Sequence, residues 1–293
     1  MKRLLLPILL FFAFDPSALA TWSVIAVDTS TGQVIIASAT CVRQSRFPPR
    51  PSRDLMDIQA VIVPGVGVAA CQAGVDNTRA NQMIVYDELR KGTDPERIIE
   101  LLREHENQKD EPQMERRQFG IVDLQGRTAG FNGERNNAAS LYVSGQVGDY
   151  IYFQVQGNIL FSDDVATNAA LRFTQAKGTL ADRVMAAMEG ADEVGGDKRC
   201  TCEEDPKPLA PCDGKTSHVA YIAVADPRDE PGRSHNDGDY YAYIRVTDEN
   251  IKPHENANPV KTLRMRYDEW KNAGSKRTGV APSIIPEGPS GRY

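Results

Sequence analysis

The sequence predicts an α+β fold in which two mainly antiparallel sheets pack together and helices cover their outer faces. β-rich runs come in pairs separated by short turns that contain glycine, as in hairpins. Stretches with helical periodicity follow these strands in separate blocks. The order along the chain is strands, two helices, strands, two helices, strands. Segregated blocks of this kind are typical of stacked layers around a shared core.

The first block of elements contains two predicted hairpins and two helices. Its predicted strands are Ser23–Val27, Gln33–Ala39, Ala60–Pro64 and Gly67–Ala73. Asn77–Lys91 has the apolar spacing of an amphipathic helix, and Gly92 ends it. The pair Asp94–Pro95 is a capping residue followed by proline, so a second helix begins there.

The second block repeats this order and leads into two late strands. Its predicted strands are Gln118–Asp123, Thr128–Phe131 and Tyr150–Val155, and its predicted helices are Asp163–Ala176 and Leu180–Glu189. The late strands are His218–Ala225 and Tyr240–Val246. Strand signals fade after about Thr247, and Glu269–Tyr293 has the polar, glycine- and proline-rich composition of a loose tail.

Residues 1–20 have the pattern of a signal peptide. Lys2 and Arg3 precede the apolar run Leu4–Phe14, and small residues stand at Ala18 and Ala20. The run is too short for a membrane-spanning helix, which needs roughly 20 apolar residues. We therefore expect cleavage after Ala20, a periplasmic or secreted protein without a membrane anchor, and Thr21 as its first residue.

Composition excludes several function classes. The 293 residues carry a formal net charge of −6, which gives no electrostatic footprint for nucleic acid. The sequence has no P-loop, no dinucleotide fingerprint and no Gly-x-Ser-x-Gly elbow. It therefore predicts no cofactor and no metal, and it leaves the oligomeric state open.

Export would place the five cysteines where disulfides persist. They are Cys41, Cys71, Cys200, Cys202 and Cys212. A metal cluster is the alternative, but their spacing is not that of a zinc site. We expect Cys41 to pair with Cys71, because both follow apolar runs, and Cys212 to pair with Cys200 or Cys202.

Five segments, taken in order, resemble the bacterial and archaeal family called domain of unknown function 1028. They are TWSVIAVDTSTGQVIIASA (21–39), GVGVAACQAGVDNTRANQMIVYDELRKGTDPERIIELL (65–102), RQFGIVDLQGRTAGFNG (117–133), QVQGNIL (154–160) and GGDKR (195–199). The resemblance covers about Thr21 to Val246. It places a family-like domain at residues 21–249, with a cysteine-containing insertion at 200–215 and an extension at 250–293.

This resemblance implies a fold and a reaction. The family is grouped with the N-terminal-nucleophile (Ntn) hydrolases, which have a four-layer α/β/β/α sandwich and cleave amide-like bonds with a first-residue Thr, Ser or Cys. Some members carry a peptidoglycan-binding domain, which points to cell-wall substrates. The implied substrate is thus a small peptide or an acyl amide, and the implied nucleophile is Thr21.

A threonine hydroxyl needs a base to act as a nucleophile, and the α-amine of a first-residue threonine can supply it. That amine has a pKa of roughly 7.7 to 8.0, so part of it is neutral near pH 7. The alternative explanation of Thr21 is that signal peptidase tolerates many residues after the cut.

Four polar residues at strand ends are candidate members of the same site. Asn158 could donate to an oxyanion, or cap a strand end. Gln72, Ser38 and Thr40 each end a predicted strand, where they would either face the cleft or have only a structural role.

Asp197 and Arg199 are the charged pair of the GGDKR segment. They would orient the amine or bind a substrate carboxylate, and a purely structural pairing is the alternative. Two functions therefore compete: an exported amidohydrolase, and a non-catalytic ligand-binding or interaction protein with the same fold.

Overall fold

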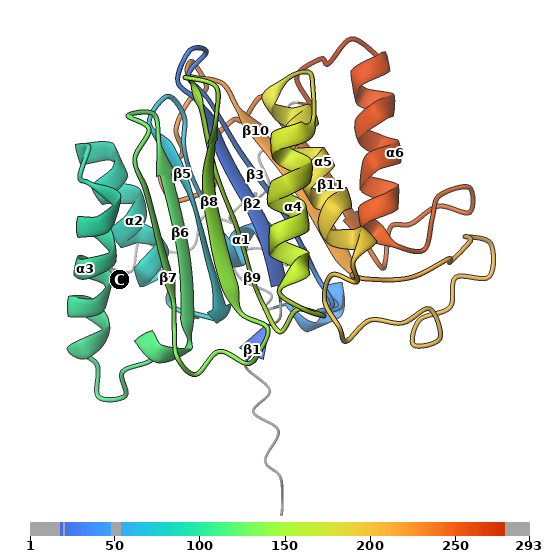
Figure 1. Ribbon diagram of the computed structural model, residues 1–293, viewed down its shortest axis with the longest axis horizontal. Helices are drawn as coiled ribbons and strands as arrows, with labels where there is room; N and C mark the ends of the chain where they lie inside the picture. The colour runs from blue at the N-terminus through green and yellow to red at the C-terminus, as the bar shows by residue number, and fades with distance from the viewer. Residues whose placement is uncertain (1–17, 20, 48–53, 279–293) are drawn as a thin grey trace, which may run out of the picture.

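The computed structural model describes residues 18–19, 21–47 and 54–278, whose strands form two antiparallel sheets (Figure 1). Sheet A has the strand order β1-β5-β6-β7, with β4 also beside β5, and sheet B has the order β11-β10-β3-β2-β9-β8. The strands of sheet A are β1 (Ala18–Leu19), β4 (Ala60–Val63), β5 (Gly67–Gly74), β6 (Arg117–Asp123) and β7 (Thr128–Asn132). Those of sheet B are β2 (Thr21–Asp28), β3 (Gln33–Thr40), β8 (Leu141–Val147), β9 (Ile151–Asn158), β10 (Val219–Ala225) and β11 (Ala242–Thr247).

Helices cover the outer face of each sheet, so the protein has four layers (Figure 1). Sheet A is covered by α2 (Ala80–Lys91) and α3 (Pro95–Asn107). Sheet B is covered by α4 (Asp164–Gln175), α5 (Leu180–Glu193) and α6 (Pro259–Asn272). The short helix α1 (Leu55–Gln59) packs into the layer between the sheets. The predicted α+β sandwich of two antiparallel sheets is confirmed.

Strand β2 is buried on both faces, which explains its nearly continuous apolar sequence. Successive side chains of a strand point to opposite faces. Trp22 and Val24 accordingly join the core beneath the helices, whereas Ile25 and Val27 join the core between the sheets. Thr21 has the same parity as Ile25 and therefore points between the sheets.

Local signals fix the helix ends as the sequence predicts. Gly92 closes α2 in the left-handed conformation, with φ of 76°. Asp94 caps α3 by accepting a hydrogen bond from the Glu96 amide, and Pro95 occupies the first turn. These caps stop one helix and start the next within a few residues, so α2 and α3 fold back onto the same face of sheet A.

Helix α6 and strand β8 are among the elements that were not predicted from the sequence. Helix α6 ends at Asn272, inside the tail that was predicted from Glu269, and it lies in the extension expected from residue 250. It joins the main core because Val260, Leu263 and Tyr267 share one helical face and are buried against sheet B. Strand β8 has a half-exposed edge position and only a weak apolar pattern.

Part of the prediction lies outside the described residues. Of the predicted signal peptide, the structure describes only Ala18–Leu19, and the expected cleavage site at Ala20 is not among the described residues. The last part of the predicted tail, residues 279–293, also lies outside them.

The layer between the sheets changes from apolar to polar along the strands. Near Gly120 the facing strand β9 presents Gln154 and Gln156 instead of aliphatic residues, and all three are buried. A Cβ on Gly120 would lie 2.4 Å from Gln154 Nε2 and 2.6 Å from Gln156 Oε1. The absence of a side chain at Gly120 thus makes room for the glutamines.

We predict that Gly120→Ala destabilises the protein by about 1–3 kcal/mol, because the new methyl group overpacks this layer and displaces hydrogen-bonded amides. Urea denaturation of the variant and the wild-type protein measures the difference. A change below about 0.5 kcal/mol would mean that the glutamines are not closely packed there.

Candidate functional site

Thr21 begins β2, an interior strand of sheet B, and lies between two polar residues of neighbouring strands. Its register partners are Thr40 on β3 and Asn158 on β9. The Thr21 side chain is 1% exposed. Its hydroxyl donates to the Thr40 hydroxyl over 3.4 Å. The sequence-predicted residues Thr21, Thr40 and Asn158 therefore meet at one end of the sheet.

Gln72 connects this strand end to sheet A. It lies two residues before the end of β5, and its Nε2 donates to the Thr21 carbonyl at 3.0 Å. Its Oε1 accepts a hydrogen bond of 2.7 Å from Ser23 Oγ. The nitrogen and the oxygen of one side-chain amide thus each bond one of the first residues of β2. Gln72 is therefore a positioning residue for Thr21.

Further glutamines extend this contact into a hydrogen-bonded layer. Gln118 of β6 accepts from Gln72 Nε2 at 2.9 Å and donates to the Gly157 carbonyl at 2.9 Å. Gln156 of β9 donates to the Ala70 carbonyl at 3.0 Å, and Gln154 donates to Gln156 at 3.2 Å. Burying amides is costly unless they are paired, and here each of these glutamines has a partner.

We call this set the polar layer: the buried polar side chains between the sheets around Thr21. Its members are Thr21, Ser23, Ser38, Thr40, Gln72, Gln118, Gln154, Gln156 and Asn158. Ser38 donates to the Trp22 carbonyl at 2.6 Å, so it supports β2 from the other neighbouring strand.

Four members of the polar layer were not predicted from the sequence: Ser23, Gln118, Gln154 and Gln156. A signal was present, since polar residues at every second position of a strand mark one face of a sheet. The run YFQVQGN carries it, with Gln154, Gln156 and Asn158 at alternate positions.

Two residues that flank the polar layer have left-handed backbone. Ala73 follows Gln72 with φ of 71°, and Ile159 follows Asn158 with φ of 56°. This conformation is a real outlier for a β-branched residue such as Ile159. Strained residues of this kind persist where the surrounding structure holds them, and they cluster at functional sites. Both lie beside a sequence-predicted site residue.

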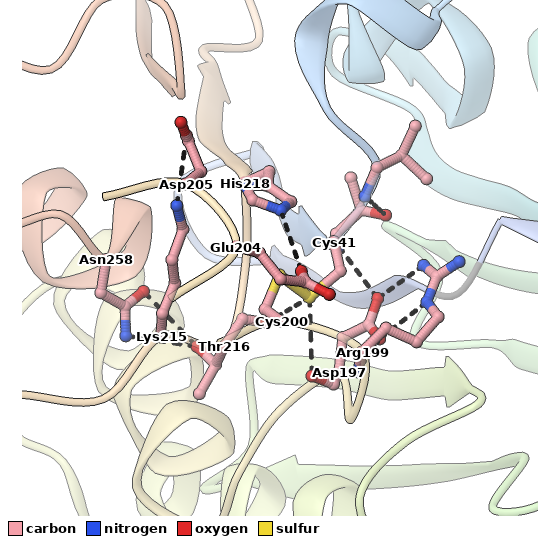
Figure 2. Close-up of a disulfide and its surroundings, with 12 residues drawn as sticks. Cys41, Asp197, Arg199, Cys200, Glu204, Asp205, Lys215, Thr216, His218 and Asn258 are labelled. Carbon is pink, nitrogen blue, oxygen red and sulfur yellow. Dashed lines mark hydrogen bonds and ion pairs between the residues drawn. A yellow bond between two sulfur atoms is a disulfide. The ribbon is translucent and has the colours of Figure 1, made fainter. Parts of the chain in front are cut away.

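Asp197 ties the GGDKR loop to the end of β3. Its carboxylate accepts the Cys41 amide at 2.9 Å and pairs with Arg199 Nη2 at 2.7 Å (Figure 2). An isolated bridge joins Asp197 to Leu160, two residues after Asn158. Asp197 is buried, and Arg199 is about one third exposed at 36%. These contacts hold the GGDKR loop against the end of β3, one residue after Thr40.

A family model described as a family of unknown function, DUF1028, matches residues 21–205, which is more than half of the chain. The chain belongs to the DUF1028 family. It is also similar to the crystal structure of protein SPO2555 from Silicibacter pomeroyi, whose title names DUF1028. The TM-score is 0.61 at 20% sequence identity, over 88% of this chain and 94% of that chain, which supports the shared fold alone. No curated protein matches this chain.

This DUF1028 protein has two disulfides, and one differs from the sequence prediction. Cys41 pairs with Cys200, with a Cα–Cα distance of 5.5 Å, so the predicted Cys41–Cys71 pair is wrong. Cys71 is a free thiol because its position on β5 directs it toward α2 and α3, on the far face of sheet A. The predicted pairing of Cys212 is confirmed with Cys202 as its partner.

The disulfides also bear on location. Bridges of this kind persist in oxidising, extracellular compartments. Among the described residues, no helix is long and apolar enough to cross a membrane.

Asp205 of the insertion and two residues outside it form a group with the spacing of a metal site. Asp205, His218 and Asp248 each place one candidate ligand atom within 4.8 Å of the others. However, Lys207 and the buried Lys215 approach Asp205 at 3.0 and 3.5 Å, so two ammonium groups already neutralise it. Burial, aided by Lys215, lowers the pKa of His218 to about 4, so this histidine is neutral at pH 7. We assign the group to an ion-pair network.

Thiol titration tests the revised disulfide pattern. Burial raises the pKa of the Cys71 thiol, so we expect no reaction with Ellman's reagent in the native protein. One thiol should react after denaturation without reductant, and Cys71→Ala should remove it. Two or more reactive thiols in wild-type protein, or one that survives Cys71→Ala, would contradict the pattern.

Proposed function

We propose that this DUF1028 protein is an exported N-terminal-nucleophile amidohydrolase that acts through Thr21. In this proposal signal peptidase removes residues 1–20, and the freed α-amine of Thr21 is the general base for its own hydroxyl. The substrate is a peptide or acyl amide, and the peptidoglycan-binding domain of some family members makes cell-wall peptides the first class to test.

The observation that carries the proposal is the polar layer. Two packed sheets would gain most stability from aliphatic side chains at every position between them. Here Thr21, the first residue of β2, and eight other buried polar side chains lie in this layer instead. The Gln72 amide fixes the main chain of Thr21, and the Thr40 hydroxyl contacts its Oγ1. Such preorganisation is what a nucleophile requires.

Position along the sequence supports the same residue. Thr21 follows directly after the predicted cleavage site, and the family match begins at Thr21. The side chain is only 1% exposed in the chain that still carries Ala18–Leu19. Removal of the leader would create the free amine at Thr21.

The reaction would proceed in two steps. Thr21 Oγ1 attacks the substrate carbonyl carbon while its proton passes to the α-amine, and the carbonyl oxygen becomes an oxyanion. The carbon–nitrogen bond then breaks, and the leaving nitrogen takes the proton back from the α-ammonium group. Water next attacks the acyl ester on Oγ1, which releases a carboxylic acid and restores the hydroxyl.

Asn158 is the proposed oxyanion donor. It pairs with Thr21 in the antiparallel register, and it shares the inter-sheet parity of Gln154 and Gln156 on β9. A preorganised amide donor typically contributes on the order of 100-fold or more in rate. Gln72 and Ser38 act indirectly: Gln72 holds the main chain of Thr21, and Ser38 holds that of Trp22.

Substitution of Thr21 tests the proposal. Thr21→Ala should lower hydrolysis of cell-wall peptides and acyl amides by at least about 1,000-fold, whereas Thr21→Ser keeps a hydroxyl and should retain measurable activity. In the wild-type protein the rate should rise with pH through roughly 7.7 to 8.0, as the α-amine loses its proton.

Thr31→Ala is the matched control, because it removes the same hydroxyl at the exposed turn of the same hairpin. Melting temperatures should be compared for all three variants to exclude unfolding. Activity that survives Thr21→Ala would refute the mechanism and favour the alternative, a non-catalytic binding protein.

A further inference from the structure

The leader strand β1 pairs with sheet A, although β2, which follows it, belongs to sheet B. Ala18 lies opposite Gly74 and Leu19 opposite Ala73, in antiparallel register with the end of β5. The chain therefore passes from one sheet to the other between Leu19 and Thr21, where cleavage is predicted. The leader strand is therefore bound to sheet A, whereas the first strand of the mature chain, β2, is bound within sheet B.

The end of β5 has one edge that only the leader covers among the described residues. On one side, β6 pairs with β5 from Gly67 to Ala73. On the other side, the pairing of β5 with β4 extends only to Ala70. Strand β1 pairs with β5 at Ala73 and Gly74. An edge with unpaired N–H and C=O groups is a template for another extended strand. Loss of residues 1–20 would open this edge beside Gln72.

We propose that this open β5 edge is the substrate subsite, and that it binds the acyl side of an extended peptide in the register the leader occupies. This inference rests on the proposed function, because it requires the leader to be removed and Thr21 to be the nucleophile. Recognition is by β-strand addition, in which main-chain hydrogen bonds supply the affinity.

The covalent geometry of threonine supports this placement. The leader is an acyl group on the nitrogen of Thr21, and the acyl-enzyme would carry the substrate's acyl group on Oγ1. Nitrogen and Oγ1 stand on adjacent carbons of one residue, so a chain that leaves either atom starts from nearly the same point. The leader thus resembles the acyl half of a bound substrate.

The register also places the reacting bond. If a peptide continues the Leu19–Ala73 pairing by one residue toward Thr21, its acyl residue lies level with Gln72. Gln72 donates to the Thr21 carbonyl, so the carbonyl under attack would be aligned with the residue that positions the nucleophile. The amine half of the substrate, which leaves, would point away from β5.

The substrate class follows from this mode of binding. An extended chain with free main-chain amides on the acyl side of the scissile bond is required. Peptides of at least three residues before that bond fit, since two residues pair with Ala73 and Gly74 and the third carries the carbonyl. Short acyl amides without a peptide chain would be poorer substrates.

Peptide binding to the mature protein tests the inference. The probe is the leader's own last six residues, the acetylated peptide DPSALA with a free carboxylate. Hydrogen exchange of the mature chain beginning at Thr21 should slow at Ala73–Gly74 when this peptide is added at millimolar concentration. The precursor that retains its leader is the control and should not respond.

N-methylated peptides provide the matched pair. The N–H groups of consecutive strand residues point to opposite edges. N-methylation at only one of the two positions corresponding to Ala18 and Leu19 should therefore weaken binding, by about fivefold or more. The other methylated peptide should bind as the unmodified one does.

No slowing of exchange at Ala73–Gly74, or equal binding of both methylated peptides and the parent, overturns the inference. Hydrolysis is measured separately. If the peptide binds this edge but Thr21→Ala leaves hydrolysis unchanged, the amidohydrolase proposal fails and the peptide site stands. If Thr21-dependent hydrolysis of acyl amides occurs without peptide binding, only the edge subsite fails.

Discussion

Gln72 joins the two sheets at the point where Thr21 begins strand β2, and the rest of the candidate site depends on that contact. The amide donates to the Thr21 carbonyl and accepts from Ser23, while Gln118 receives its second hydrogen. In a medium of low dielectric such bonds are strong and an unpaired amide is costly. The sheets therefore have one favourable register at this end, and that register sets the position of Thr21.

The polar layer contributes less hydrophobic stabilisation than aliphatic side chains would at the same positions. At the other end of the same strands, Ile25, Val27 and Ile36 form an ordinary aliphatic core between the sheets. The helices on the outer faces add two further apolar cores. The molecule thus has enough aliphatic packing elsewhere to keep the nine buried polar side chains of this layer.

Local patterns in the sequence predicted most of the fold. Hairpin strands, the Gly92 helix end and the Asp94–Pro95 start depend on neighbouring residues, so they can be read from short stretches. Strand β8 could not, because its edge position leaves half of its side chains exposed and weakens the apolar signal.

The site was only partly predictable for a different reason. Polarity at strand ends indicated Gln72 and Asn158, but the partners Ser23 and Gln118 depend on which strands face one another across the layer. The disulfides show the same limit. Cys41 and Cys71 both follow apolar runs, yet strand parity sends Cys71 to the helix side of sheet A, and the GGDKR loop brings Cys200 to Cys41 instead. Such pairings depend on the tertiary structure and cannot be read from short stretches of sequence.

The central claim is that a free Thr21 amine begins the mature chain. Intact mass and N-terminal sequencing of the protein recovered after export test it most directly. The account predicts a chain that begins at Thr21 with an unblocked amine. A chain that begins at another residue, or a capped amine at Thr21, would contradict it.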